Sequence, residues 1–159
     1  MNFREFDDII KKTTLEAGYG IFADFQKQTY YMYGTTYPEM GYSCIGFHYW
    51  KSSDLNIWNG PFTAFIPDEN FWGTKDFWAP EVHFYNGKYF MFASCKAENK
   101  CRATHIFCAD TPEGPFVPIS PEPATPHDWE CLDGTLYVED EIPYIVFCHE
   151  WKQVEDGEI

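Results

Sequence analysis

The sequence predicts an all-β fold built from repeated four-stranded units, of the type found in β-propellers. Aromatic residues make up 20% of the 159 residues, far more than helical bundles usually carry. Short aromatic and β-branched runs, bounded by turn residues, follow one another along most of the chain. They recur with a long period, which is typical of a repeated supersecondary unit. The sequence therefore predicts about two and a half such units.

The N-terminal segment, residues 1–16, is the stretch in which apolar residues have helical spacing. Phe3, Phe6, Ile9 and Ile10 lie at rough helical intervals. We expect a helical or extended segment there, followed by β-structure over residues 17–159.

Three runs hold equivalent places in the predicted repeat. They are "QTYYMYGTT", "GKYFMFASC" and "IPYIVFCHE", and each follows a turn and a further short strand. Tyr30, Tyr89 and Tyr144 occupy matching positions, 59 and 55 residues apart, and a Gly-Pro-Phe triplet recurs at an offset of 54. The repeat predicts blades at residues 17–72, 73–126 and 127–159.

Two and a half blades are too few to close a propeller, which normally has roughly 4 to 8 blades. We therefore expect an incomplete propeller, completed by a second chain, or an open β structure. A β-sandwich is the structural alternative, but its strands would not recur with blade-like similarity. Because half a propeller leaves apolar faces and a strand edge uncovered, the sequence predicts a homodimer or a complementing chain.

The charge and the apolar pattern exclude several classes of partner. The chain carries 25 acidic against 11 basic residues, a formal net charge of −14. Nucleic acid and anionic membranes both reward clustered Lys and Arg, so neither is expected as a partner. The chain has no N-terminal apolar signal region and no long uncharged apolar span. Its localisation stays open between a cytosolic protein and one whose signal has been removed.

The six cysteines predict neither a metal site nor a cofactor. The chain has no C-x-x-C and no His pair at finger-like spacing, which argues against zinc. Most of the cysteines lie inside apolar strand-like runs, where a reduced Cys packs as a small hydrophobe. Cys95 and Cys101, which bracket "KAENK", are the pair that a hairpin could bring together.

Five motifs in one order carry a resemblance to a known family. They are "YYMYGTT", "SSDLNIW", "FWAPEVHFYNGKYFMF", "TPEGPF" and "CLDGTLYVEDEIPYIVFCHEW". In that order they resemble the N-terminal half of glycoside hydrolase family 43, five-bladed propeller enzymes that act on arabinose- and xylose-containing polysaccharides. The resemblance implies an inverting mechanism with three carboxylates facing one cavity: a base, an acid, and a third that tunes the pKa of the acid and orients it.

Asp133 holds the place of this third carboxylate. Asp before Gly most often forms a turn. In "CLDGTLYVED", however, it falls where the family keeps its pKa-tuning Asp, at the channel end of the third blade's inner strand. The resemblance therefore implies a catalytic-site role for Asp133, and Gly134 would let the strand approach the cavity closely.

The other two carboxylates depart from the family pattern. The family's base is the Asp of an "RDP"-like motif, and "EAGYGIFAD" puts Gly18 at that place, with Tyr19 where Pro is expected. Glu16 lies nearby but faces a register problem, and Asp24 would point into the outer turn. The general acid is expected from a later blade, beyond Ile159.

Four further residues are candidates for sugar binding. The resemblance implies cavity-lining positions for Trp78 and Glu81. The pair would suit a sugar, since aromatic rings stack on sugar rings and a carboxylate accepts hydrogen bonds from hydroxyl groups. The alternative is a purely structural role, with Trp78 packed in the fold and Glu81 on the surface. His149 and Glu150 end the strand that pairs with the Asp133 strand, and antiparallel pairing returns them to the Asp133 end. A His at a strand end is otherwise unremarkable.

Two functions are compatible with the sequence. The first is a family 43 glycosidase that hydrolyses arabinose- or xylose-containing glycosides, with weak or incomplete activity in this chain because the expected base and acid are missing. The second is a non-catalytic carbohydrate-binding or assembly module descended from such an enzyme. The expected ligand is a carbohydrate, whose sugar and linkage stay open; an assembly module would keep the blade fold and does not require the sugar pocket.

Overall fold

The structure is a computed structural model that describes residues 19–36 and 44–154. The predicted segment 1–16 and the predicted base position Gly18 lie outside the described residues. The described strands are β1 Tyr19–Asp24, β2 Thr29–Gly34, β3 Phe47–Ser52, β4 Asn59–Phe65, β5 Lys75–Tyr85, β6 Lys88–Lys96, β7 Ala103–Ala109, β8 Val117–Pro118, β9 Cys131–Glu139 and β10 Ile142–His149. A 3-10 turn, η2, follows at Trp151–Gln153.

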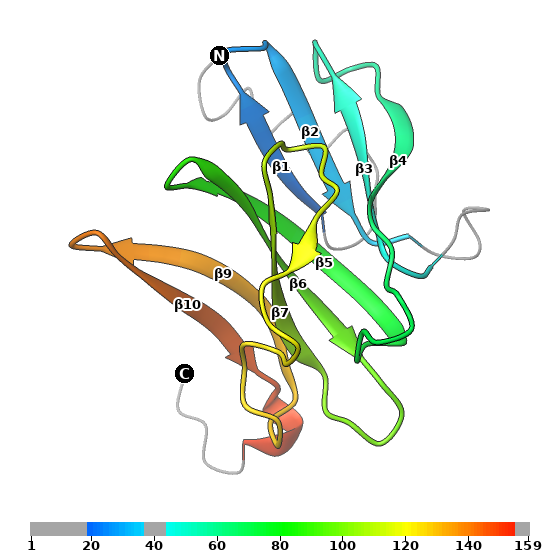
Figure 1. Cartoon of the computed structure of the whole chain (residues 1–159), viewed down its shortest axis with the longest axis vertical. Coiled ribbons are helices and arrows are strands. Elements are labelled where there is room, and N and C mark those ends of the chain that lie inside the picture. Colours follow the sequence, from blue (N-terminus) through cyan, green and yellow to red (C-terminus); the bar gives the residue numbers. More distant parts are fainter. Residues whose placement is uncertain (1–18, 37–43, 155–159) are drawn as a thin grey trace.

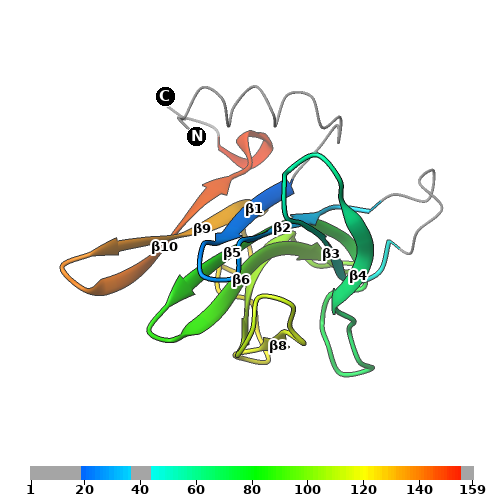
Figure 2. The ribbon, with the colours of Figure 1, turned by 90° about the horizontal axis from the view of Figure 1, so that it is seen from above.

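The strands form two four-stranded antiparallel sheets, β1-β2-β3-β4 and β5-β6-β7-β8, and a hairpin of β9 and β10. Within each group, strands that are neighbours in sequence are paired, which is the order of a propeller blade. The three groups follow one another through the molecule, with the second sheet between the first sheet and the hairpin (Figure 1, Figure 2). The predicted all-β fold of two four-stranded blades and part of a third is thus confirmed.

Turn chemistry closes two of the hairpins in the same way. Asn86 and Gly87 join β5 to β6 with φ of 48° and 80°, and Asp140 and Glu141 join β9 to β10 with φ of 48° and 64°. Two-residue hairpin turns with positive φ suit the twist of antiparallel strands. Counted from these turns, Tyr144 lies one position further along its strand than Tyr89, so the predicted equivalence of these two residues is wrong by one position.

An aromatic core joins the first two blades. The Phe47 ring of β3 lies 5.4 Å from Phe77 of β5 and 5.7 Å from Phe107 of β7, measured between ring centroids. Phe47 and Phe107 are fully buried, and Met91 of β6 is buried in the same cluster. The packing fixes the relative position of the two sheets, because each buries its apolar face against the other.

The β9–β10 hairpin packs on the second blade through one face and leaves the other exposed. Strand β9 contacts β6 and β7. On the outer face Tyr137, Ile142, Tyr144 and Val146 are about half exposed, at 49%, 53%, 46% and 52%. We refer to these four residues as the outer hairpin face.

The six cysteines are all free thiols, including the Cys95 and Cys101 pair. Cys95 and Cys131 are buried, as expected for thiols that pack as small hydrophobes. No helix among residues 19–36 and 44–154 has the length and apolar content needed to cross a membrane.

Candidate active site

A small cavity of about 170 Å³ lies where the first strands of the three groups meet. Its lining comes from β1, β5 and β9: Tyr19, Gly20, Ala79, Pro80, Glu81, Asp133 and Gly134. The structure thus brings two of the predicted site residues, Asp133 and Glu81, to one cavity. Tyr19, which stands where the family resemblance expects Pro, lines the same space.

A β-bulge presents Asp133 to this cavity. Thr135 pairs with Val146 and Leu132 with Cys148, so Asp133 and Gly134 together oppose the single residue Phe147. Asp133 has a φ of 53°, a left-handed conformation that Asp tolerates better than most residues. Bulges often redirect a side chain beside an active site. The sequence left two roles open for Asp133, a turn residue and a site residue. The two are compatible, because the turn-like backbone of the bulge is what directs the Asp133 carboxylate.

The second blade has the same device at Ala79 and Pro80, which oppose a single residue of β6. Ala79 has a φ of 46°, and its N–H donates to Thr35 Oγ1 of the first blade at 3.0 Å. Correspondingly, the N–H of Asp133 donates to Ser94 Oγ of the second blade at 3.2 Å. Each bulge is thus held by a buried hydroxyl from the preceding blade, which fixes the edge of the cavity.

Glu81 is held by a histidine and faces the bulge from the second blade. Its Oε1 lies 3.2 Å from His83 Nε2, and the same nitrogen lies 3.2 Å from Thr135 Oγ1 of β9. The hydrogen bond with His83 lowers the pKa of Glu81, against the opposing effect of burial. Glu81 is therefore ionised at neutral pH and can accept hydrogen bonds from a polyhydroxylated ligand.

The pKa of Asp133 is displaced in the opposite direction. Burial by the cavity walls raises it, the positive charge of Arg102 lowers it, and the negative charge of Glu150 raises it again. This burial is partial, since the residue as a whole remains exposed. The pKa values of the two carboxylates that line the cavity are therefore displaced in opposite directions, downward for Glu81 and upward for Asp133.

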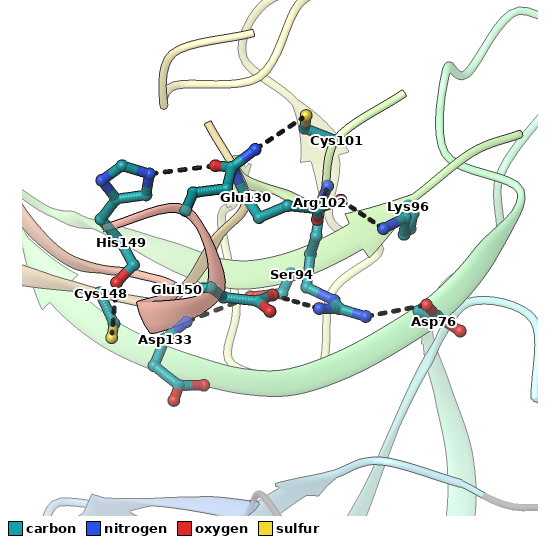
Figure 3. Close-up of polar contacts among 11 residues, drawn as sticks. Asp76, Ser94, Lys96, Cys101, Arg102, Glu130, Asp133, Cys148, His149 and Glu150 are labelled. Carbon is teal, nitrogen blue, oxygen red and sulfur yellow. Dashed lines mark hydrogen bonds and ion pairs between the residues drawn. The ribbon is translucent and has the colours of Figure 1, made fainter. Parts of the chain in front are cut away.

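Trp78 and Glu150 meet at Arg102, beside Asp133. The Arg102 guanidinium lies over the Trp78 ring, with Cζ 4.1 Å from the ring centroid. Its Nη1 binds Glu150 Oε1, and its Nη2 lies 3.0 Å from Asp76 Oδ2 (Figure 3). One face of Trp78 is thus covered by a cation, and the residue remains 36% exposed.

His149 lies apart from the cavity. Its ring is stacked on Trp129, with centroids 4.3 Å apart and planes within 8° of parallel. Its Nε2 is 3.0 Å from Gln153 Oε1. In Figure 3 the His149 ring points away from the Asp133 carboxylate. The strand end does return to the Asp133 side, since His149 pairs with Cys131, but the imidazole faces a different set of residues.

Asp24 stands at the outer turn, as the sequence predicted. Its Oδ1 accepts hydrogen bonds from the N–H groups of Gln26 and Lys27, each at 3.1 Å. Glu16 lies outside the described residues. Within residues 19–36 and 44–154, no group of three or more His, Cys, Asp and Glu side chains is arranged to hold a metal ion.

The sequence did not indicate four residues that surround the cavity lined by Asp133 and Glu81: Asp76, His83, Ser94 and Arg102. One signal was available for Arg102: apart from Arg4 it is the only arginine in the chain, and it directly precedes the apolar run "ATHIFCA". A cation at the start of a buried strand needs partners, because burying an unpaired charge is costly.

Comparison with known proteins agrees with the geometry. Residues 23–159 match the family described as glycosyl hydrolases family 43. Xylosidase/arabinosidase 43A of Humicola insolens is 30% identical over 81 residues, which cover 50% of this chain and 24% of that protein.

Solved structures match over more of the chain. An endo-arabinase from Bacteroides thetaiotaomicron is 35% identical, with a TM-score of 0.77, over 86% of this chain and 46% of that one. An endo-1,4-beta-xylanase from the same organism is 28% identical, with a TM-score of 0.63, over 82% of this chain and 43% of that one. The chain therefore spans less than half the length of these relatives.

Proposed function

Since the chain belongs to glycosyl hydrolase family 43, we propose that its cavity is part of a site that hydrolyses arabinose- or xylose-containing glycosides by an inverting acid/base mechanism. The observation that carries the proposal is the bulge that aims Asp133 into the cavity shared with Glu81. The names of the relatives, a xylosidase/arabinosidase, an endo-arabinase and an endo-1,4-beta-xylanase, support the substrate class.

In this proposal Asp133 tunes and orients the general acid. An ionised carboxylate beside a second carboxyl group raises the pKa of that group, so the acid stays protonated until it donates to the leaving oxygen. The hydrogen bond from the Asp133 N–H to Ser94 and the bulge hold the carboxylate at the cavity mouth. Glu81 and the open part of Trp78 are proposed to bind sugar hydroxyls and a sugar ring face.

We expect weak turnover by the 159-residue chain. Gly18 stands at the base position that the resemblance indicates, and Gly cannot abstract a proton. General acid and base groups typically contribute about 10²–10⁴-fold each to the rate. The same observation favours a second candidate function, a carbohydrate-binding or assembly module that keeps the pocket without turnover.

The test is a panel of glycosides assayed on the chain and on Asp133→Asn, with p-nitrophenyl arabinofuranoside and p-nitrophenyl xyloside as chromogenic substrates. Asp140→Asn is the matched control, because Asp140 is an exposed residue with a similar φ of 48° at the far end of the same hairpin. We expect any hydrolysis to be weak, to fall in Asp133→Asn and to be unchanged in Asp140→Asn.

Two results separate the candidates. Binding of arabino- or xylo-oligosaccharides by calorimetry, without hydrolysis, would support the binding module. Robust hydrolysis that survives Asp133→Asn would show that both the proposed site and the proposed mechanism are wrong.

A further inference from the structure

Arg102 joins the second blade to the third at the edge of the candidate site. It lies just before β7 and is 9% exposed. Its guanidinium binds Asp76 of β5 through Nη2 and Glu150, at the end of β10, through Nη1. One planar cation thus holds carboxylates from two different blades, a geometry that suits arginine and its rigid fork of donors better than lysine.

The backbone of Arg102 is tied to the start of β9 as well. Its carbonyl oxygen accepts the N–H of Cys131 at 2.8 Å, and its N–H donates to Glu130 Oε2 at 2.6 Å. Cys131 is two residues before Asp133. Both ends of the hairpin segment that carries Asp133 are therefore attached to this one residue.

We propose that Arg102 is a positioning residue of the site: its ion pairs and backbone bonds hold the β9 bulge against the second blade, and its charge sets the electrostatic surroundings of the Asp133 carboxylate. The functional meaning of this role rests on the hydrolytic function proposed above. Arg102 itself does not line the cavity. It acts through Asp133 and Glu150, not on the ligand.

The charges that surround Asp133 have opposite effects on its titration. Arg102 lowers the pKa of Asp133 and Glu150 raises it. Glu81 of β5 and Tyr19 of β1 face the same cavity from the other side. Neutralising Arg102 and neutralising Glu150 must therefore shift the pKa of Asp133 in opposite directions, whereas general loosening of the hairpin would shift it the same way in both variants.

The experiment is a ¹³C NMR titration of the side-chain carboxyl of Asp133 in the 159-residue chain. We expect Arg102→Gln to raise the pKa of Asp133 and Glu150→Gln to lower it. Arg102→Lys keeps the positive charge and should restore the pKa toward the wild-type value. Lys88→Gln is the matched control, since it removes one positive charge from an exposed ion pair with Asp110 in the same sheet, and should leave Asp133 unchanged.

Arg102→Gln leaves two carboxylates unpaired and can fail to fold, so Glu150→Gln carries the test alone if necessary. An unchanged or raised pKa of Asp133 in Glu150→Gln would overturn the proposal, as would equal shifts in Arg102→Gln and Lys88→Gln. The titration requires no turnover. A chain that titrates as expected but hydrolyses nothing would refute the proposed hydrolysis and leave the positioning role of Arg102 standing.

Discussion

Gly134 is a point of close approach between the third blade and the second, and Gly134→Ala should push the two apart. A Cβ at this position would lie 2.5 Å from Thr104 Cγ2, 2.8 Å from Thr104 Oγ1 and 3.0 Å from Thr104 Cβ. Thr104 is fully buried in β7. Rotation of the Thr104 side chain cannot remove the whole overlap, because Thr104 Cβ itself would still lie 3.0 Å from the added methyl group. Either β9 or β7 must move.

The expected cost follows from this overlap. Extra methyl groups in well-packed cores typically cost about 1–3 kcal/mol, and a contact with a side chain that cannot rotate away belongs in the upper half of that range. Thr104→Ala removes Cγ2 and Oγ1 and leaves the contact with Cβ alone. In the double variant we therefore expect a favourable coupling of about 1–2 kcal/mol between the two substitutions.

Urea denaturation of the two single variants and the double variant measures these free energies, provided that the m values agree. Gly34→Ala is the matched control, since a Cβ there meets Trp50 and Tyr19 only at 3.6 Å and 3.7 Å. It should be neutral or stabilising by about 0.4–1 kcal/mol through the unfolded state. If Gly134→Ala were as stable as the wild-type chain, or if its effect were not coupled to that of Thr104→Ala, the close approach of β9 and β7 would be refuted.

Two further predictions concern Asp133 and the outer hairpin face. Burial raises the pKa of Asp133 above its usual 3.8, so the folded state binds this proton more tightly than the unfolded state does. The free energy of unfolding of the wild-type chain, relative to that of Asp133→Asn, must therefore fall as the pH rises from below 3.8 through the folded-state pKa. Denaturation midpoints of the two proteins that diverge in the other direction would contradict this prediction. We also expect a homodimer that covers the outer hairpin face, seen by light scattering as twice 18.7 kDa and lost in Tyr144→Glu. A wild-type monomer at micromolar concentration would count against that arrangement.

The blade architecture could be predicted from the sequence because its determinants are local. Alternating aromatic and β-branched runs specify strands, and Asn86 with Gly87 specifies a two-residue turn, whatever the rest of the chain does. The long period then implies repeated meanders. Motif order singles out Asp133, and the Asp-Gly pair that suggests a turn does have turn-like backbone, with a φ of 53° at Asp133 inside a bulge.

The contents of the site depended on side-chain direction, which local patterns do not fix. Consecutive strand residues point to opposite faces. His149 and Glu150 are adjacent in sequence and return to the same end of the hairpin, yet His149 stacks on Trp129 while Glu150 binds Arg102. Each bulge adds one residue to one strand, so the residues after it point to the opposite face from the one that strict alternation along the sequence assigns to them. Strict alternation therefore cannot predict which side chains meet.

The sequence by itself determined the strand-forming segments, the repeat, the family and the candidacy of Asp133, because each can be read from short local patterns and from their order along the chain. Only the tertiary structure decided that Asp133 shares a cavity with Glu81, that His149 does not, and that Arg102 ties Asp76 to Glu150. Those contacts join residues from different blades. They arise when apolar sheet faces pack together and buried charges find partners, and neither process is encoded in any single stretch of the chain.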